Sequence, residues 1–198
     1  MPKKTPVFNP ALEPITQPLP ETIAASIGRT IARHSYMEWV LGQVLYSLLE
    51  ISIKQGRAVV QRPQPRQYVA SIQGLCAFQK IDCKFDFDGL THRVEAADRA
   101  RDALVHSVYM RDIGTDSDRV FLVHGSWARP NEAEVIRTGE WPDTPVLDRA
   151  FLSNARKMMD DAVKSAEELQ ALVGALLRQL HELRRTNPKY NRRRSDRA

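Results

Sequence analysis

The sequence predicts an all-α fold, a four-helix-type bundle with short additional segments and a small β excursion before the last long helix. Three observations lead to this prediction. Along three long stretches, apolar residues recur at steps of three and four, which is the spacing of one helix face. Apolar residues form 42% and charged residues 27% of the 198, as in an ordinary globular domain. The longest apolar runs span only a few residues, so no membrane span is expected.

Residues 1–20 differ in composition from the rest of the chain. They contain six of the twelve prolines, five of them at strict four-residue spacing. Proline breaks helices, and the segment has few side chains to bury, so an extended or disordered flexible arm is expected. The alternative is a docking role for the repeated prolines. No apolar stretch follows Lys3 and Lys4, so a signal peptide is not expected.

The first long helix is expected from Glu21 to Ile53. One face of it is apolar with a single polar member, in the order His34, Met37, Leu41, Val44, Leu48 and Ile51. Gly56 and a proline-bearing stretch, residues 62–66, then form a link. A shorter second helix is expected from Gln67 to Lys80.

The third helix is expected from Asp88 to Met110. Its seam consists of Leu90, Val94, Ala97, Arg101, Leu104 and Val108. The pattern then changes to a turn-rich stretch, residues 113–118, followed by a short β-prone run from Val120 to Val123. Residues 133–137 could pair with this run, which predicts a small β excursion between helices.

The last helix is expected from Pro145 to Leu183, with Thr144 as its N-cap and Pro145 at its first position. Ten seam positions follow one another, namely Leu152, Ala155, Met159, Ala162, Ala166, Leu169, Val173, Leu176, Leu180 and Leu183. Such a helix would be about 58 Å long, which exceeds what a compact monomer needs. We therefore expect part of the seam to meet a second chain in a homodimer. The alternative is a long helix with a frayed end.

The net charge of +5 arises at the C-terminal end. Residues 184–198 contain seven basic residues and one acid, so this segment carries +6 and the other 183 residues carry −1. The chain therefore divides into an arm (1–20), a helical bundle domain (21–183) and a basic disordered tail (184–198). The tail, with Arg192, Arg193 and Arg194, can bind RNA phosphates by charge, or it can be a solvated end.

Several kinds of chemistry have no support in the sequence. The five histidines form no pair at metal-ligand spacing, and no phosphate-binding glycine loop or G-x-S-x-G elbow occurs, so no metal and no cofactor is expected. Cys76 and Cys83 are expected to be free, buried thiols on one helix face, which fits a reducing, cytoplasmic compartment. Trp39, Trp127 and Trp141 are expected to be packing residues rather than platforms that stack on bases.

One motif remains, Arg101-Asp102-Ala103-Leu104-Val105-His106. Here the chain resembles the HEPN family of small helical-bundle proteins, many of which are ribonucleases. Arg101 matches the family's Arg, Asp102 the polar residue that follows it, and His106 the His after four further residues. The order of helices is also similar over residues 21–183. A Tyr that some family toxins carry two residues after the His is absent, since Val108 stands there and Tyr109 follows.

The spacing of Arg and His is not unique in this chain. Arg29 and Arg119 also precede a His by five positions, at His34 and His124. Arg101 is distinguished because it occupies an apolar seam, where an unpaired guanidinium is costly. Asp102 stands four residues before His106, so the carboxylate can orient the imidazole and favour its charged form. On a regular helix Arg101 and His106 point about 140° apart, so they need not touch each other.

The resemblance implies a metal-independent endoribonuclease. Arg101 would hold the phosphate, His106 would transfer protons, and the product would carry a 2′,3′-cyclic phosphate. Two Arg–His pairs in a homodimer would build one composite site. A polar stripe beside the seam, Glu95, Arg99, Asp102, His106 and Tyr109, could line the RNA groove, with Arg99 and Tyr109 binding RNA. Toxin and phage-defence proteins occur in the family, so an antitoxin or another protein is a further conceivable partner.

Two other interpretations are open. Arg101 could form a structural ion pair with Glu38 or Glu50, and the protein would then be a non-catalytic bundle that binds RNA or a protein partner. A nucleotide-binding bundle is the third interpretation, less favoured because the sequence shows no phosphate loop. Exposure of Arg101 and His106 together would favour the enzyme.

Overall fold

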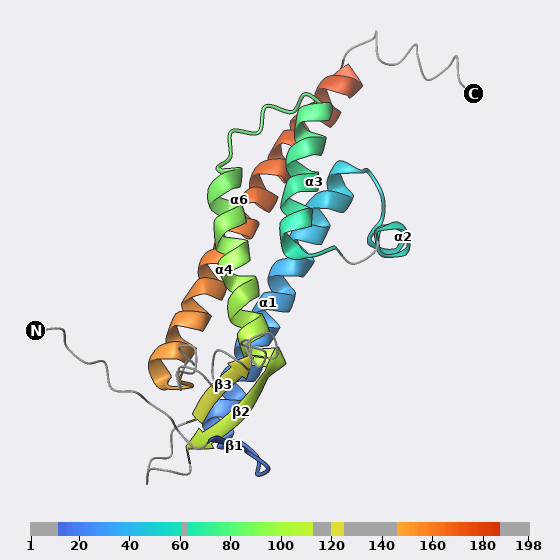
Figure 1. Cartoon of the computed structure of the whole chain (residues 1–198). Helices are drawn as coiled ribbons and strands as arrows, with labels where there is room; N and C mark the ends of the chain where they lie inside the picture. The colour runs from blue at the N-terminus through green and yellow to red at the C-terminus, as the bar shows by residue number, and fades with distance from the viewer. Residues whose placement is uncertain (1–11, 61–62, 113–119, 125–145, 187–198) are drawn as a thin grey trace, which may run out of the picture. The chain divides into compact units, whose positions relative to one another are not determined.

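The computed structural model describes residues 12–60, 63–112, 120–124 and 146–186. These residues are mostly helical, so the predicted all-α bundle class is confirmed. The helices are α1 (Glu21–Leu48), α2 (Ile53–Val59), α3 (Pro65–Phe78), α4 (Phe87–His106) and α6 (Arg149–Thr186) (Figure 1). The strands are β1 (Leu12–Pro14), β2 (Ser107–Asp112) and β3 (Val120–His124). Within the described residues, no helix is both long enough and apolar enough to span a membrane.

The chain divides into two compact units. The first takes its residues from Met1–Ala32 and Ala97–Met158, the second from Arg33–Ala96 and Met159–Ala198. Helices α1, α4 and α6 each contribute residues to both units.

The first unit contains a three-stranded antiparallel sheet in the order β1-β2-β3 (Figure 1). The third helix was expected to reach Met110, but α4 ends at His106 and the chain enters β2 directly. As the central strand, β2 forms backbone hydrogen bonds on both sides, and Met110 lies opposite Pro14 and Phe121. This pairing outweighs the helical period of the sequence. β3 confirms the β-prone run, while its expected partner, residues 133–137, lies outside the described residues.

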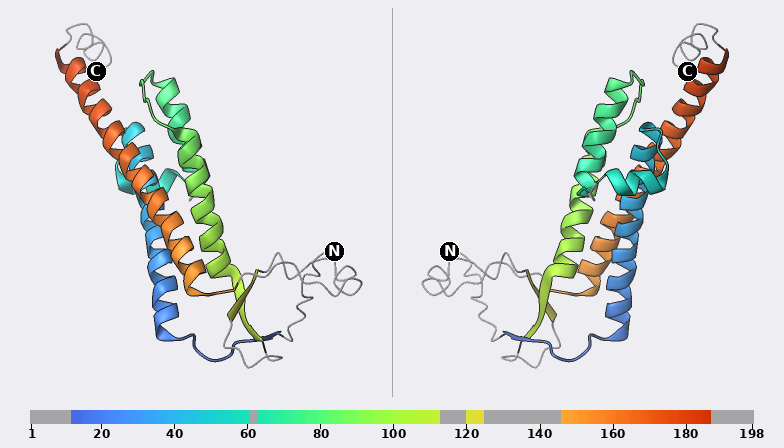
Figure 2. Two further views of the ribbon diagram at one scale, coloured as in Figure 1. Left: turned by 90° about the vertical axis from the view of Figure 1, so that its left-hand side faces the viewer. Right: turned by 90° about the vertical axis from the view of Figure 1, so that its right-hand side faces the viewer.

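The second unit is helical and holds most of the fully buried large side chains. The 33–48 part of α1 lies alongside α6 (Figure 2). Its buried residues include Met37, Leu41, Leu48, Ile72, Leu90, Met159 and Leu169. Five of the six face positions predicted for the first helix, all but Ile51, are buried within α1, among them the polar His34.

Helix α1 ends at Leu48, five residues before the predicted end. Glu50 takes a left-handed backbone conformation, with φ 54°, and the N–H of Ile51 donates to the carbonyl of Tyr46 at 3.1 Å. This turn closes the helix in the manner of a Schellman motif. The chain then starts α2, which was not predicted. Its signal was present in the sequence, because Ser52 and Gln55 form a reciprocal capping box.

Helix α3 begins at Pro65, two residues earlier than predicted, with proline at its first position. It ends at Phe78, and the side-chain amide of the following Gln79 donates to the carbonyl of Leu48 at 2.7 Å. Cys76 is buried in this helix, but Cys83 lies beyond it and is only half-buried, so the two thiols do not share a helix face as expected.

Helix α6 begins at Arg149 rather than Pro145. The carboxylate of Asp148 accepts the N–H of Phe151 at 2.7 Å and so caps the first turn, while Thr144 and Pro145 lie outside the described residues. The helix continues to Thr186, so Arg184, predicted to start the tail, is helical and bonds Glu50 at 3.0 Å.

The predicted α6 seam is buried from Leu152 to Val173. It becomes half-buried at Leu176 and Leu180 and 66% exposed at Leu183. The last turns of α6 therefore carry an apolar row that the described residues do not cover.

Candidate functional site

Three side chains of the predicted motif meet at the C-terminal end of α4, in the first unit. The Nη1 atom of Arg101 lies 2.7 Å from Oδ1 of Asp102 and 3.1 Å from Nε2 of His106. The side chains of Arg101, Asp102 and His106 are 34%, 45% and 56% exposed. Arg101 and His106 point about 140° apart on the helix, but their side chains still meet because the Arg side chain is long. We call these three residues the Arg–Asp–His cluster.

The bond between Arg101 and His106 joins the guanidinium to the imidazole. A guanidinium donates hydrogen bonds and has no acceptor, so Nε2 of His106 must be the acceptor. His106 thus lies beside a permanent positive charge at the exposed end of α4.

Asp102 contacts both of the other side chains of the cluster. Its Oδ1 accepts from Arg101 at 2.7 Å and lies 3.9 Å from Nε2 of His106, which is too long for a hydrogen bond but within ion-pair distance when the imidazole is protonated. The shorter contact is the one to the guanidinium.

Arg101 is not buried in the α4 seam as its spacing predicted. Its seam neighbours Ala97 and Leu104 are buried, while the Arg101 side chain stays about one-third exposed. A long Arg side chain can cover apolar surface with its methylenes and still present its charged end to water. Of the two alternative partners named for Arg101, Glu50 is bound by Arg184.

The residues expected to bind RNA do not form one stripe. Arg99 is exposed on α4, but Tyr109 lies in β2 because the helix has already ended. The Tyr109 hydroxyl donates to the carbonyl of Leu104, and burial raises the pKa of this tyrosine. Arg192, Arg193 and Arg194 lie outside the described residues.

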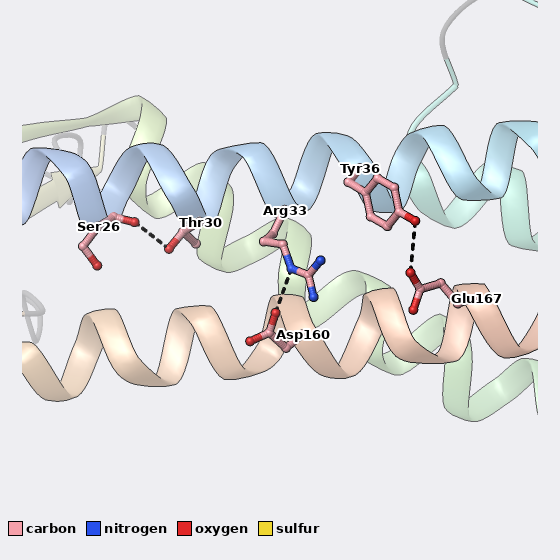
Figure 3. A network of polar contacts seen from close by, with 6 residues as sticks. All are labelled: Ser26, Thr30, Arg33, Tyr36, Asp160 and Glu167. Carbon is pink, nitrogen blue, oxygen red and sulfur yellow. Dashed lines mark hydrogen bonds and ion pairs between the residues drawn. The ribbon is translucent and has the colours of Figure 1, made fainter.

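A second group of side chains, in the second unit, was missed from the sequence. Arg33 on α1 donates to Asp160 on α6 at 2.9 Å, and the Tyr36 hydroxyl donates to Glu167 at 3.0 Å (Figure 3). The hydrogen bond to Glu167 raises the pKa of Tyr36. Trp39 stacks on Tyr36 with ring centroids 5.7 Å apart.

Trp39 is 44% exposed and packs against the Tyr36 ring. Trp127 and Trp141 lie outside the described residues. Trp39 also borders a pocket of about 520 Å³ formed by α1, α2 and α3. The apolar face of α1 gave no signal of this pocket, because its lining residues come from the opposite, mixed face and from the unpredicted α2.

In the part of the chain that the structure describes, no three His, Cys, Asp or Glu side chains come together in a group that could hold a metal ion. Comparison with protein families, with curated proteins and with solved structures gives no match for this chain.

Proposed function

We propose that this protein is a metal-independent endoribonuclease of the HEPN type. The observation that supports the proposal is the contact between Arg101 and His106, 3.1 Å apart at the exposed end of α4. One permanent cation suited to phosphate and one imidazole, side by side and open to water, are the two kinds of group that RNA cleavage without metal needs.

The cluster supplies the base and the cation of the proposed reaction. A phosphate of bound RNA draws the Arg101 guanidinium away from Nε2, which frees the imidazole lone pair. His106 takes the proton of the 2′-hydroxyl, the 2′-oxygen attacks phosphorus, and the bond to the 5′-oxygen breaks. The protonated imidazole of the second cluster in the proposed homodimer donates a proton to the leaving oxygen, which gives a 2′,3′-cyclic phosphate and a 5′-hydroxyl end. Arg101 stabilises the negative charge that develops on the phosphorane.

The proposal includes a homodimer. The apolar row at the end of α6, half-buried at Leu176 and Leu180 and exposed at Leu183, supports it, because this row continues the spacing of the buried seam. A second chain would bring a second Arg–Asp–His cluster, and its imidazole could protonate the leaving oxygen. The proposed setting is the cytoplasm, where two free thiols stay reduced and RNA is present.

The test is cleavage of a labelled single-stranded RNA of mixed sequence in EDTA. Arg101→Ala and His106→Ala should each lower the cleavage rate by roughly a hundredfold or more, because each removes one catalytic group. Asp102→Asn should cost less, because only the orientation of Arg101 is affected. The 2′,3′-cyclic phosphate is identified by mass spectrometry of the products.

Three control variants keep the overall composition close to that of the parent. His92→Ala removes an exposed histidine of the same helix, and Arg29→Ala and Arg119→Ala test the other two Arg–His spacings. All three should cleave like the parent protein. If the parent leaves RNA intact, or if His106→Ala cleaves as fast as the parent, the enzyme proposal is wrong.

A non-catalytic RNA-binding bundle is the second candidate. It is favoured by the fact that Arg101 is already bonded to both Asp102 and His106, as in a stable surface network. Retention of a labelled RNA without cleavage, lost in Arg101→Ala, would establish this function instead.

A further inference from the structure

The pocket of the second unit is a half-open cleft lined by residues of α1, α2 and α3. Its volume of about 520 Å³ falls within the range of small-molecule sites, about 300–1,000 Å³. Among the side chains around it are Glu38, Trp39 and Tyr46 of α1, Arg57 of α2 and Tyr68 of α3. Tyr46 and Tyr68 are buried, so two aromatic walls are fixed in place.

Trp39 supplies a third aromatic wall that is held before any ligand arrives. Its indole stacks on Tyr36 with an interplanar angle of 21°, and Tyr36 is tied to α6 by its bond to Glu167. Arg33, bonded to Asp160, lies 6.0 Å from the centre of the Tyr36 ring. Figure 3 shows Arg33 and Tyr36 directed from α1 toward α6. An exposed indole that is already oriented binds a flat ring at a low entropic cost.

The pocket also holds one carboxylate and one guanidinium. Within the described residues, neither Glu38 nor Arg57 has a hydrogen-bond or ion-pair partner, although both border the same cavity. Glu38 is half-buried, and an acceptor in that position favours a ligand that brings N–H donors. Arg57 is exposed and suits an anionic group such as phosphate.

Gly42 lies in the interior of α1, where glycine is less favourable than alanine. Packing does not require it, because a Cβ at this position would meet the Tyr46 ring at 3.7 Å, an ordinary contact. Gly42 borders the pocket, so the missing methyl group leaves space in the cavity rather than relieving a clash.

We propose that this pocket binds a guanylate unit, as a free nucleotide or within single-stranded RNA. The base stacks against Trp39, its N1–H and N2 amino group donate to the Glu38 carboxylate, and the phosphate binds Arg57. Guanine is the RNA base whose edge offers two adjacent N–H donors to a carboxylate. The inference does not depend on the proposed cleavage, since it uses none of the residues of the Arg–Asp–His cluster.

The experiment is a calorimetric titration of the full chain with GMP, AMP and guanosine, and with a short RNA that contains one guanine. Saturable GMP binding stronger than AMP binding is expected. Trp39→Ala and Glu38→Gln should each weaken GMP binding by roughly tenfold or more, and Glu38→Gln should abolish the preference over AMP. Arg57→Ala should weaken GMP binding but leave guanosine unchanged, because guanosine has no phosphate.

Gly42→Ala is the space-filling variant, and Gly28→Ala on the same helix is its control, because a Cβ at 28 meets nothing within 4 Å. Both should melt at or above the parent temperature, and only Gly42→Ala should bind GMP less tightly. If the RNA binds more tightly than GMP, the guanylate unit that the pocket recognises is one within RNA. The proposal is overturned if GMP and AMP bind equally, or if neither nucleotide nor the RNA binds. It is also overturned if the pocket binds tetramethylammonium, a cation that aromatic rings attract, but not GMP.

Discussion

Asp102 makes one contact in the cluster that its spacing suggests and one that it does not. Its carboxylate lies 3.9 Å from Nε2 of His106, four positions along the helix, and it also binds the adjacent Arg101 at 2.7 Å. The sequence therefore indicated which three residues form the motif, but not that Arg101 bonds both of the others. Spacing along a helix gives the positions of backbone atoms, whereas the length and rotamer of the Arg side chain decide the contacts.

Cys76 carries a pH dependence that can be measured. Burial, with a smaller contribution from the Cys83 thiol, raises the pKa of Cys76 from 9.0 to about 11. Between these values the unfolded chain loses the thiol proton while the folded protein keeps it. The resulting stabilisation is complete below about pH 9 and is lost as the pH rises toward 11. Urea unfolding across this window should show a smaller decline in stability for Cys76→Ala than for the parent.

The parent and Cys76→Ala are compared by how steeply their free energy of unfolding falls with pH, because the variant also leaves a cavity that lowers stability at every pH. Tyr36 and Tyr109 occur in both proteins, so their titration cancels. An identical decline in the parent and in Cys76→Ala would contradict the raised pKa.

At the scale of elements, α2 depends on one glycine. A Cβ at Gly56 would lie 2.4 Å from the Tyr46 ring, too close for any real contact. Gly56→Ala should therefore destabilise the protein by about 1–3 kcal/mol, the usual cost of overpacking. Gly74→Ala in α3, where a Cβ meets nothing within 4 Å, should leave stability unchanged or raise it by up to about 1 kcal/mol. Urea denaturation measures both changes, and equal stability of the two variants would exclude the close packing of α2 on Tyr46.

The long elements were the most predictable from the sequence. Strong apolar periodicity located α1, α4 and α6, because burial of one helix face dominates their stability. The errors lie at the ends, where single residues decide. The left-handed Glu50 ends α1, and the capping box of Ser52 starts α2, while strand pairing converts residues 107–110 from helix to sheet. Such pairing depends on segments distant in sequence, which local patterns do not record.

The two candidate sites also differ in how well the sequence predicts them. The Arg–Asp–His cluster was found because all three residues lie within six positions of one helix. The pocket was not found, because its walls come from three helices, and one of these, α2, was itself unpredicted. Trp39 could have been noticed as an aromatic residue off the apolar face of α1, next to Tyr36 and Arg33 in the helical spacing.

At the scale of the whole molecule, the proposed homodimer gives the last prediction. Light scattering at micromolar concentration should report about 45 kDa, twice the 22.5 kDa of one chain. Leu183 is 66% exposed at the end of the apolar row of α6, so Leu183→Glu should shift the mass to that of a monomer without unfolding the chain. Met158→Glu, on the same helix but off the seam and 42% exposed, should stay dimeric. A parent protein that scatters as a monomer contradicts the dimer and the composite cleavage site with it, and a dimeric Leu183→Glu contradicts the α6 interface.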